Sequence, residues 1–134
     1  INTSLTDLQI ANDLAPANPR IQESLARVYL AASRPIEALL TTDAALNNDP
    51  RAINARKTRA RALEGLGRSR EAVLELDNLL KRRIGDPDLL TWRGRLHEKR
   101  RNNRQALADY RNAARRKSTQ GLMEAIERME RIVD

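Results

Sequence analysis

The fold is decided by residues 59–80, which read RARALEGLGRSREAVLELDNLL. The second half of this stretch has the i, i+4, i+7, i+8 spacing of one apolar helical stripe, made by Ala72, Leu76, Leu79 and Leu80. Before that stripe, Gly65-Leu66-Gly67 interrupts the apolar pattern, as turn residues do. The stretch therefore predicts a helix, a short turn and a second helix, and period-two alternation typical of a strand is absent from the sequence.

The same pattern recurs along the chain at an interval of 34 residues. Small residues repeat at this interval in two sets, namely Ala38, Ala72 and Ala106, and Ala26, Ala60 and Gly94. A period of this length is typical of a repeated helix-turn-helix unit. Breaks at Ser33-Arg34-Pro35 and Asn102-Asn103 fall between the two helices of the other units.

Helix starts are indicated by a capping side chain followed by proline, since a first helical turn does not need the N–H that proline lacks. This pairing occurs at Asn18-Pro19, Asp49-Pro50 and Asp86-Pro87. We therefore expect a helix to begin at each of the three places.

On these residues the chain resembles the tetratricopeptide repeat family over about residues 19–118. Each second helix opens with a small residue and an aliphatic one, as Ala38-Leu39, Ala72-Val73 and Ala106-Leu107, and each first helix carries a large residue three positions after its small one, as Tyr29, Leu63 and His97. The sequence departs from the family pattern at two positions of the repeat. The first-helix leucine is present as Leu25 but is replaced by Arg59 and Arg93 in the later repeats, and the closing proline is present as Pro50 but is replaced by Ile84 and Ser118. The resemblance implies an all-α fold, an α-α superhelix or solenoid of helix-turn-helix repeats.

The expected organisation is one structural domain that is a fragment of a larger protein. Residues 1–16 fit the second helix of a preceding partial repeat, with an apolar stripe of Leu5, Leu8, Ala11 and Leu14. Residues 19–118 hold three full repeats, at about 19–52, 53–86 and 87–120. Residues 120–134 form a C-terminal capping helix, or the first helix of a further repeat, with the stripe Leu122, Ile126, Met129 and Val133.

Composition sets few limits on where the protein works. The chain has no cysteine, which is compatible with the cytoplasm and with the bacterial periplasm. No apolar run reaches the 18 or so residues of a membrane span. Because aromatic residues make up only 2% of the chain, we expect a core built on Leu, Ala and Ile. We also expect a monomer.

The net charge of +7 comes from the middle of the chain, since residues 51–117 hold 20 Arg and Lys against 8 Asp and Glu. Arginine outnumbers lysine 21 to 4, and guanidinium groups suit carboxylate or phosphate ligands. An anionic partner is one interpretation. The other is that arginine coats a solvated helix surface.

Candidate contact residues follow from the resemblance, which implies a concave groove lined by one face of the first helices. Arg27, Arg61 and Arg95 repeat there at 34 residues, which would place their guanidinium groups about 10 Å apart. The predicted groove contacts are Arg27, Lys57, Arg61, Trp92 and Arg95. The alternative for the arginines is local pairing, of Arg61 with Glu64 and of Arg95 with Glu98. The alternative for Trp92 is packing in the core rather than anchoring a partner.

We expect no enzymatic activity, no cofactor and no metal site. His97 is the only histidine and falls where Tyr29 and Leu63 stand in the other repeats, which favours a packed imidazole over a general base. The glycines of Gly65-Leu66-Gly67 lack the other residues of a phosphate-binding loop.

The sequence therefore predicts a protein-protein interaction scaffold that takes a partner peptide or domain with an acidic segment in its groove. The first alternative is binding of nucleic acid or another polyanion through the arginine-rich middle, although interleaved aromatics for base stacking are lacking. A weaker alternative is a scaffold for bacterial envelope assembly or polysaccharide export.

Overall fold

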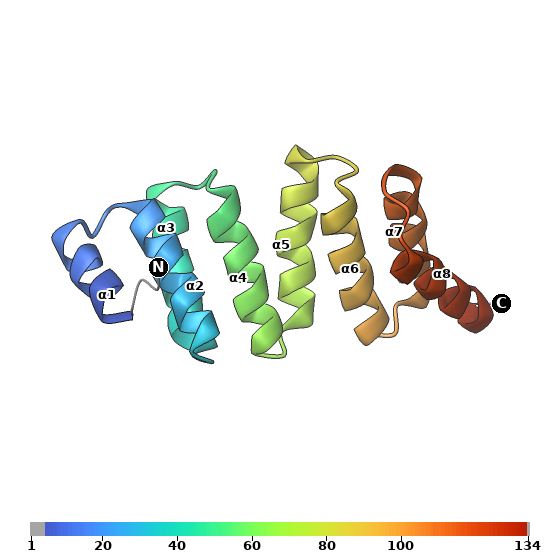
Figure 1. Ribbon diagram of the computed structural model, residues 1–134, viewed down its shortest axis with the longest axis horizontal. Coiled ribbons are helices and arrows are strands. Elements are labelled where there is room, and N and C mark those ends of the chain that lie inside the picture. The colour runs from blue at the N-terminus through green and yellow to red at the C-terminus, as the bar shows by residue number, and fades with distance from the viewer. Residues whose placement is uncertain (1–4, 134) are drawn as a thin grey trace. The chain divides into compact units, whose positions relative to one another are not determined.

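The computed structural model describes residues 5–133, and over these residues the chain forms eight α-helices and no strand (Figure 1). The first four helices are α1 (Leu5–Leu14), α2 (Pro19–Ala31), α3 (Pro35–Asn48) and α4 (Ile53–Gly65). The other four are α5 (Ser69–Arg82), α6 (Pro87–Lys99), α7 (Asn103–Arg116) and α8 (Gln120–Val133). This confirms the all-α prediction. Residues 1–4 and 134 of the predicted terminal segments lie outside the described residues.

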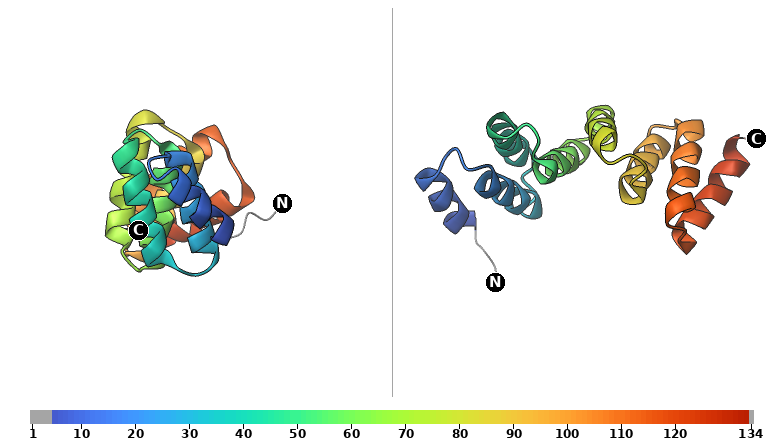
Figure 2. Two further views of the ribbon diagram at one scale, coloured as in Figure 1. Left: turned by 90° about the vertical axis from the view of Figure 1, so that its left-hand side faces the viewer. Right: turned by 90° about the horizontal axis from the view of Figure 1, so that it is seen from above.

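The helices belong to two compact units, Ile1–Glu75 and Leu76–Asp134, whose boundary falls within α5. We call them the N-terminal unit and the C-terminal unit. In the N-terminal unit α2, α3 and α4 contact one another, and α1 packs on α2 (Figure 2). In the C-terminal unit α7 packs on both α6 and α8.

Two of the three predicted helix starts are confirmed. Asn18 caps α2 by accepting hydrogen bonds from the N–H groups of Arg20 (3.0 Å) and Ile21 (3.3 Å). Asp86 caps α6 in the same way, through the N–H groups of Asp88 (3.0 Å) and Leu89 (3.1 Å). Each cap satisfies donors that the first helical turn leaves unpaired.

The third predicted start, at Asp49-Pro50, is wrong, because α4 begins at Ile53. The N–H of Asp49 still donates to Ala45 of α3, at 2.8 Å, so Asp49 closes the preceding helix. Its carboxylate accepts from the N–H of Arg51 (3.1 Å) and stabilises the turn that separates the two helices.

Small residues sit where helices cross closely. All six members of the two repeating sets are buried, namely Ala26, Ala38, Ala60, Ala72, Gly94 and Ala106. At one such crossing, a Cβ added to Gly94 of α6 would lie 2.7 Å from the ring of Tyr110 on α7. The ladders of small residues therefore mark helix contacts, as their interval predicted.

The predicted terminal stripes are only partly buried. Leu8 of α1 is buried, but Leu14, the last residue of this helix, is 82% exposed. In α8 the buried side chains are Leu122, Ala125 and Met129, whereas Ile126 and Val133 are half-buried. Within residues 5–133, no helix has the length and apolar character needed to cross a membrane.

Candidate functional site

Arg59, which replaces the first-helix leucine of the family pattern, is held by two acidic side chains within the N-terminal unit. Its Nε donates to Asp43 of α3 at 2.7 Å, and its Nη1 donates to Glu75 of α5 at 2.9 Å. Arg56 donates a second hydrogen bond to Glu75, at 3.1 Å. Burial lowers the pKa of Arg59, but the hydrogen bonds and charges of Asp43 and Glu75 outweigh burial and raise it above its ordinary value.

Arg93 has the same arrangement in the C-terminal unit. It donates two bonds to Asp109 of α7, at 2.8 and 2.9 Å, and one to Asp77 of α5, at 2.9 Å. The hydrogen bonds to Asp109 are the main cause that raises the pKa of Arg93. In both units the acids stand 16 residues before and 16 residues after the arginine. Both substituted arginines are therefore used inside the fold, as links between helices.

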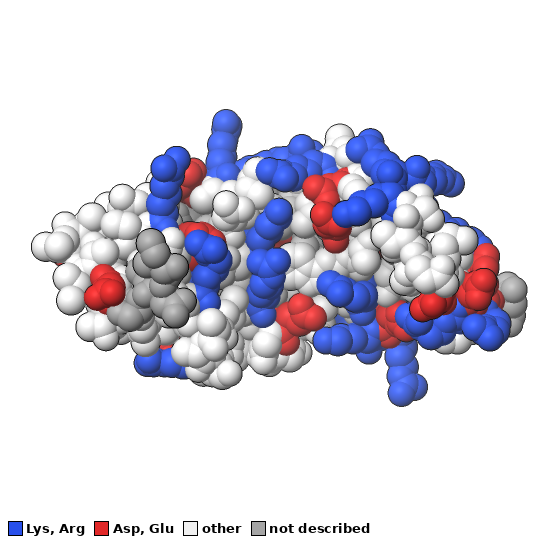
Figure 3. Space-filling model, in the orientation of Figure 1, with Lys and Arg blue, Asp and Glu red and all other residues white. Residues whose placement is uncertain are grey.

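Three of the predicted contact residues, Arg27, Lys57 and Arg61, lie on α2 and α4 of the N-terminal unit. Arg27 is 61% exposed and bonds Glu23 through Nε at 2.9 Å. Glu23 also faces Thr58 of α4, whose hydroxyl donates to it at 3.4 Å, so this carboxylate lies at the seam between the two first helices. Lys57 is half-buried and Arg61 is exposed. Figure 3 shows Lys and Arg side chains over α2 and α4 on this face.

The fourth, Arg95, is exposed on α6 of the C-terminal unit. Its predicted alternative partner, Glu98, instead accepts hydrogen bonds from Arg128 of α8 (both 2.9 Å) and from the hydroxyl of Tyr110 (2.8 Å). The hydrogen bond from Arg128 is the main cause that lowers the pKa of Glu98, and burial is the main cause that raises the pKa of Tyr110. The local pairing of Arg95 with Glu98 was wrong, because Arg128 reaches Glu98 from 30 residues away.

Trp92, the fifth predicted contact, is only 8% exposed on α6. A side chain so far removed from water offers little surface to a partner. The burial of Trp92 therefore agrees with packing in the core and not with an exposed anchor for a partner.

His97 is half-buried, with Nε2 3.8 Å from the carboxylate of Asp109. Its Nδ1 is buried and has no hydrogen-bond partner within the described residues, so the imidazole is packed but not fully satisfied. Burial is the main cause that lowers its pKa. Among residues 5–133 no group of three or more His, Cys, Asp or Glu side chains could hold a metal ion.

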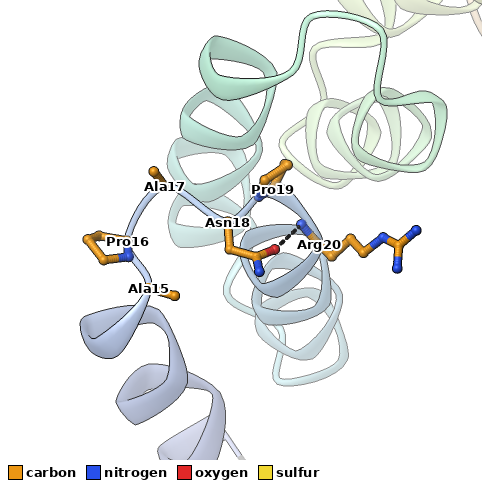
Figure 4. Close-up of a pocket in the computed structure, with 6 residues that line it drawn as sticks. All are labelled: Ala15, Pro16, Ala17, Asn18, Pro19 and Arg20. Atoms are coloured by element: carbon orange, nitrogen blue, oxygen red, sulfur yellow. Dashed lines mark hydrogen bonds between the residues drawn. The ribbon is translucent and has the colours of Figure 1, made fainter.

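An open pocket of about 530 Å³ lies at the turn between α1 and α2 (Figure 4). It is lined by Ala15, Pro16, Ala17, Asn18, Pro19 and Arg20. The Asn18 oxygen is already used to cap α2, so the lining offers no activated nucleophile or acid-base pair.

No protein-family model and no curated protein sequence matches the chain. Its structure, however, is similar to solved structures of tetratricopeptide repeat proteins. A crystal structure of MamA superposes with a TM-score of 0.85 at 13% identity, covering 93% of this chain and 74% of that one. A tetratricopeptide repeat protein from Parabacteroides merdae ATCC 43184 gives 0.82 at 21% identity, covering 94% of this chain and 52% of that one.

A third similar structure is the first tetratricopeptide repeat domain of the human RPAP3 protein, with a TM-score of 0.76 at 13% identity, covering 89% of this chain and 94% of that one. The chain thus has the tetratricopeptide repeat fold, as its 34-residue period predicted. It spans about half of the Parabacteroides protein and nearly all of the RPAP3 domain.

Proposed function

We propose that this chain is a non-catalytic binding module that takes an acidic peptide segment of another protein against its first helices. The proposed contacts are Arg27, Lys57 and Arg61 on α2 and α4 of the N-terminal unit. The repeat fold supports this proposal because helical repeats of this kind present extended binding surfaces.

The observation that carries the proposal is the shared register of Arg27 and Arg61. They stand 34 residues apart on α2 and α4, two first helices that contact each other, and both are exposed. Guanidinium groups at a regular interval suit carboxylates along an extended peptide, since each can form two parallel bonds to a carboxylate.

The ion pair that Arg27 makes is no obstacle to a partner. Arg27 is mostly solvated in its pair with Glu23, and an exposed pair of this kind contributes about 0 to 1 kcal/mol. A carboxylate of a bound peptide can therefore compete for the same guanidinium. Arg59 and Arg93 are excluded from the proposed surface because their donors are used inside the fold.

Nucleic acid is the second candidate, supported by the excess of arginine between residues 51 and 117. Binding of single strands usually adds aromatic side chains on which bases stack. Here Trp92 and Tyr110 are buried and Tyr29 is half-buried, so no described aromatic residue is exposed. We therefore favour the peptide.

The proposal is tested with an array of equally long acidic, neutral and basic peptides, followed by fluorescence anisotropy on a fluorescein-labelled acidic peptide that binds. Replacing Arg27 and Arg61 by Glu should weaken the affinity at least about tenfold, which is about 1.4 kcal/mol. Binding of the wild-type chain should also weaken as salt shortens the Debye length.

The matched control replaces Arg83 and Arg115 by Glu, which changes the net charge equally at the C-terminal ends of α5 and α7. This control should stay within about twofold of wild type. Equal losses in the two double variants would show a diffuse basic surface instead of a specific one.

A further inference from the structure

Two basic triplets repeat at the 34-residue interval in the C-terminal unit. Lys81-Arg82-Arg83 ends α5 and Arg115-Arg116-Lys117 ends α7, and all six side chains are exposed. Figure 3 shows Lys and Arg side chains gathered at the upper edge, over these two helix ends. We call these six residues the basic end.

The two triplets form one surface because α7 reaches the loop that follows α5. The Arg116 guanidinium packs on this loop, so that a Cβ added to Gly85 would lie 2.9 Å from its central carbon. Lys117 lies 3.6 Å from Asp88, in the first turn of α6. Asp86 is the other acid here, and it is used to cap α6. Six basic side chains thus stand against two acids that already have local partners.

Helix-end electrostatics alone does not explain this surplus. Basic residues are favourable near a helix C-terminus. The corresponding residues at the end of α3, however, are Asn47, Asn48 and Asp49, and α3 has no basic residue in its last turn. The fold therefore tolerates uncharged and acidic side chains at this position of the repeat.

An apolar side chain is exposed next to the basic end. Ile84 is 78% exposed in the loop between α5 and α6, where the family pattern has a closing proline. A lone exposed isoleucine is ordinary. Ile84 follows Arg83 and precedes Gly85, against which the Arg116 guanidinium packs. Basic side chains beside an exposed apolar one are the combination with which peripheral proteins bind anionic bilayers, since the charges attract the headgroups and the apolar residue enters the interface.

We propose that the basic end docks on a membrane surface rich in anionic lipids, with Ile84 inserted among the headgroups. Such docking needs no membrane-spanning helix. An exposed isoleucine contributes little to contact with the phosphates of a nucleic acid, and no exposed aromatic residue is present within residues 5–133 to stack on bases. The proposal is independent of peptide binding at the first helices.

The test is co-sedimentation of the full chain with vesicles made of equal parts phosphatidylserine and phosphatidylcholine, compared with vesicles of phosphatidylcholine alone. Only the anionic vesicles should retain the chain, and retention should fall as salt rises from about 0.1 M to about 0.5 M. Since each basic side chain at such a surface contributes about fivefold, Arg83→Glu with Arg115→Glu should weaken binding at least tenfold. Ile84→Ser should weaken it about fivefold.

The matched control is Arg100→Glu with Arg104→Glu, which makes the same charge change near the other end of α6, about 20 Å away. It should stay within about threefold of wild type. Circular dichroism checks that each variant is folded. The neutral variant Arg83→Gln with Arg115→Gln should lose less vesicle binding than the Glu variant and more than the control. No retention by anionic vesicles overturns the proposal, and so does an equal loss in the control. Tighter binding to a duplex oligonucleotide, unaffected by Ile84→Ser, overturns it in favour of nucleic acid.

The same variants separate this proposal from the proposed function. Arg83→Glu with Arg115→Glu should leave peptide affinity within about twofold of wild type while it weakens vesicle binding at least about tenfold. Arg27→Glu with Arg61→Glu should weaken peptide affinity at least about tenfold and leave vesicle binding within about threefold of wild type. The peptide assay and the vesicle assay can therefore overturn one proposal without affecting the other.

Discussion

Arg93 and Asp109 are joined by two parallel hydrogen bonds, one of 2.9 Å from Nε to Oδ2 and one of 2.8 Å from Nη2 to Oδ1. The pair links α6 to α7, and the Asp109 side chain is only 5% exposed. A carboxylate so far removed from water must be compensated by a cation or by hydrogen bonds. Arg93 is therefore needed as the partner of a buried charge.

Replacing Arg93 by Ala should lower the free energy of unfolding by about 3 to 5 kcal/mol, because it leaves Asp109 buried without its cation. Arg95→Ala removes the same charge from an exposed position on the same helix and should cost less than about 0.5 kcal/mol. Urea denaturation of the two variants measures the difference. If replacing Arg93 and Asp109 together by Leu also costs about 3 to 5 kcal/mol, the uncompensated charge is not the cause.

Gly94→Ala should destabilise the C-terminal unit by about 1 to 3 kcal/mol, despite the better helix propensity of alanine. The added Cβ would lie 2.7 Å from the Tyr110 ring, which is fully buried and bonded to Glu98 and so has no room to move. Gly121→Ala in α8 is the control, since its Cβ would meet nothing closer than 4.0 Å. Thermal unfolding should show a lower midpoint for the first variant only, and equal midpoints would contradict the close crossing of α6 and α7.

His97 should make stability fall as the pH decreases below about 6.5. Burial lowers its pKa in the folded chain, Arg93 and Arg100 act in the same direction, and Asp109 and Asp77 oppose them. The imidazole of His97 therefore binds a proton more readily in the unfolded chain than in the folded chain. The contribution of neutral His97 to stability is complete above the pKa of the unfolded chain, and it is lost as the pH falls toward the lower pKa of the folded chain.

Urea midpoints measured between about pH 7.5 and about pH 5.5 test this expectation. Carboxylates with a lowered pKa, such as Glu98, take up protons only below this pH range and so do not contribute to the change. His97→Leu places in this position the residue that Leu63 provides in the preceding repeat, and it should flatten the dependence. A dependence that persists in this variant would assign the titration to another group.

Met129→Ala should lower the free energy of unfolding by about 2 to 5 kcal/mol, because it opens a cavity between α8 and α7. Met129 is 1% exposed, whereas Met123 on the same helix is 46% exposed. Met123→Ala should therefore cost less than about 0.5 kcal/mol. Similar losses in the two variants would mean that α8 does not bury the face described here.

Much of the fold could be predicted from local sequence. Three features could be found because they involve only residues close together in the chain or a fixed interval along it. They are the interval between Ala38, Ala72 and Ala106, the breaks at glycine and proline, and the caps at Asn18 and Asp86. The helix start predicted at Asp49-Pro50 was wrong, because a cap followed by proline also fits a turn after the preceding helix, and local sequence does not separate the two.

The sequence by itself thus determined that this protein is a series of helices with a 34-residue repeat and an excess of arginine. Only the tertiary structure decided which arginines are internal links and which are exposed. Arg93 and Arg95 lie two residues apart on one helix, yet one bonds acids 16 residues away on either side and the other is exposed. The reason is physical, because the free energy of a charged side chain depends on the partners and the water that packing places around it.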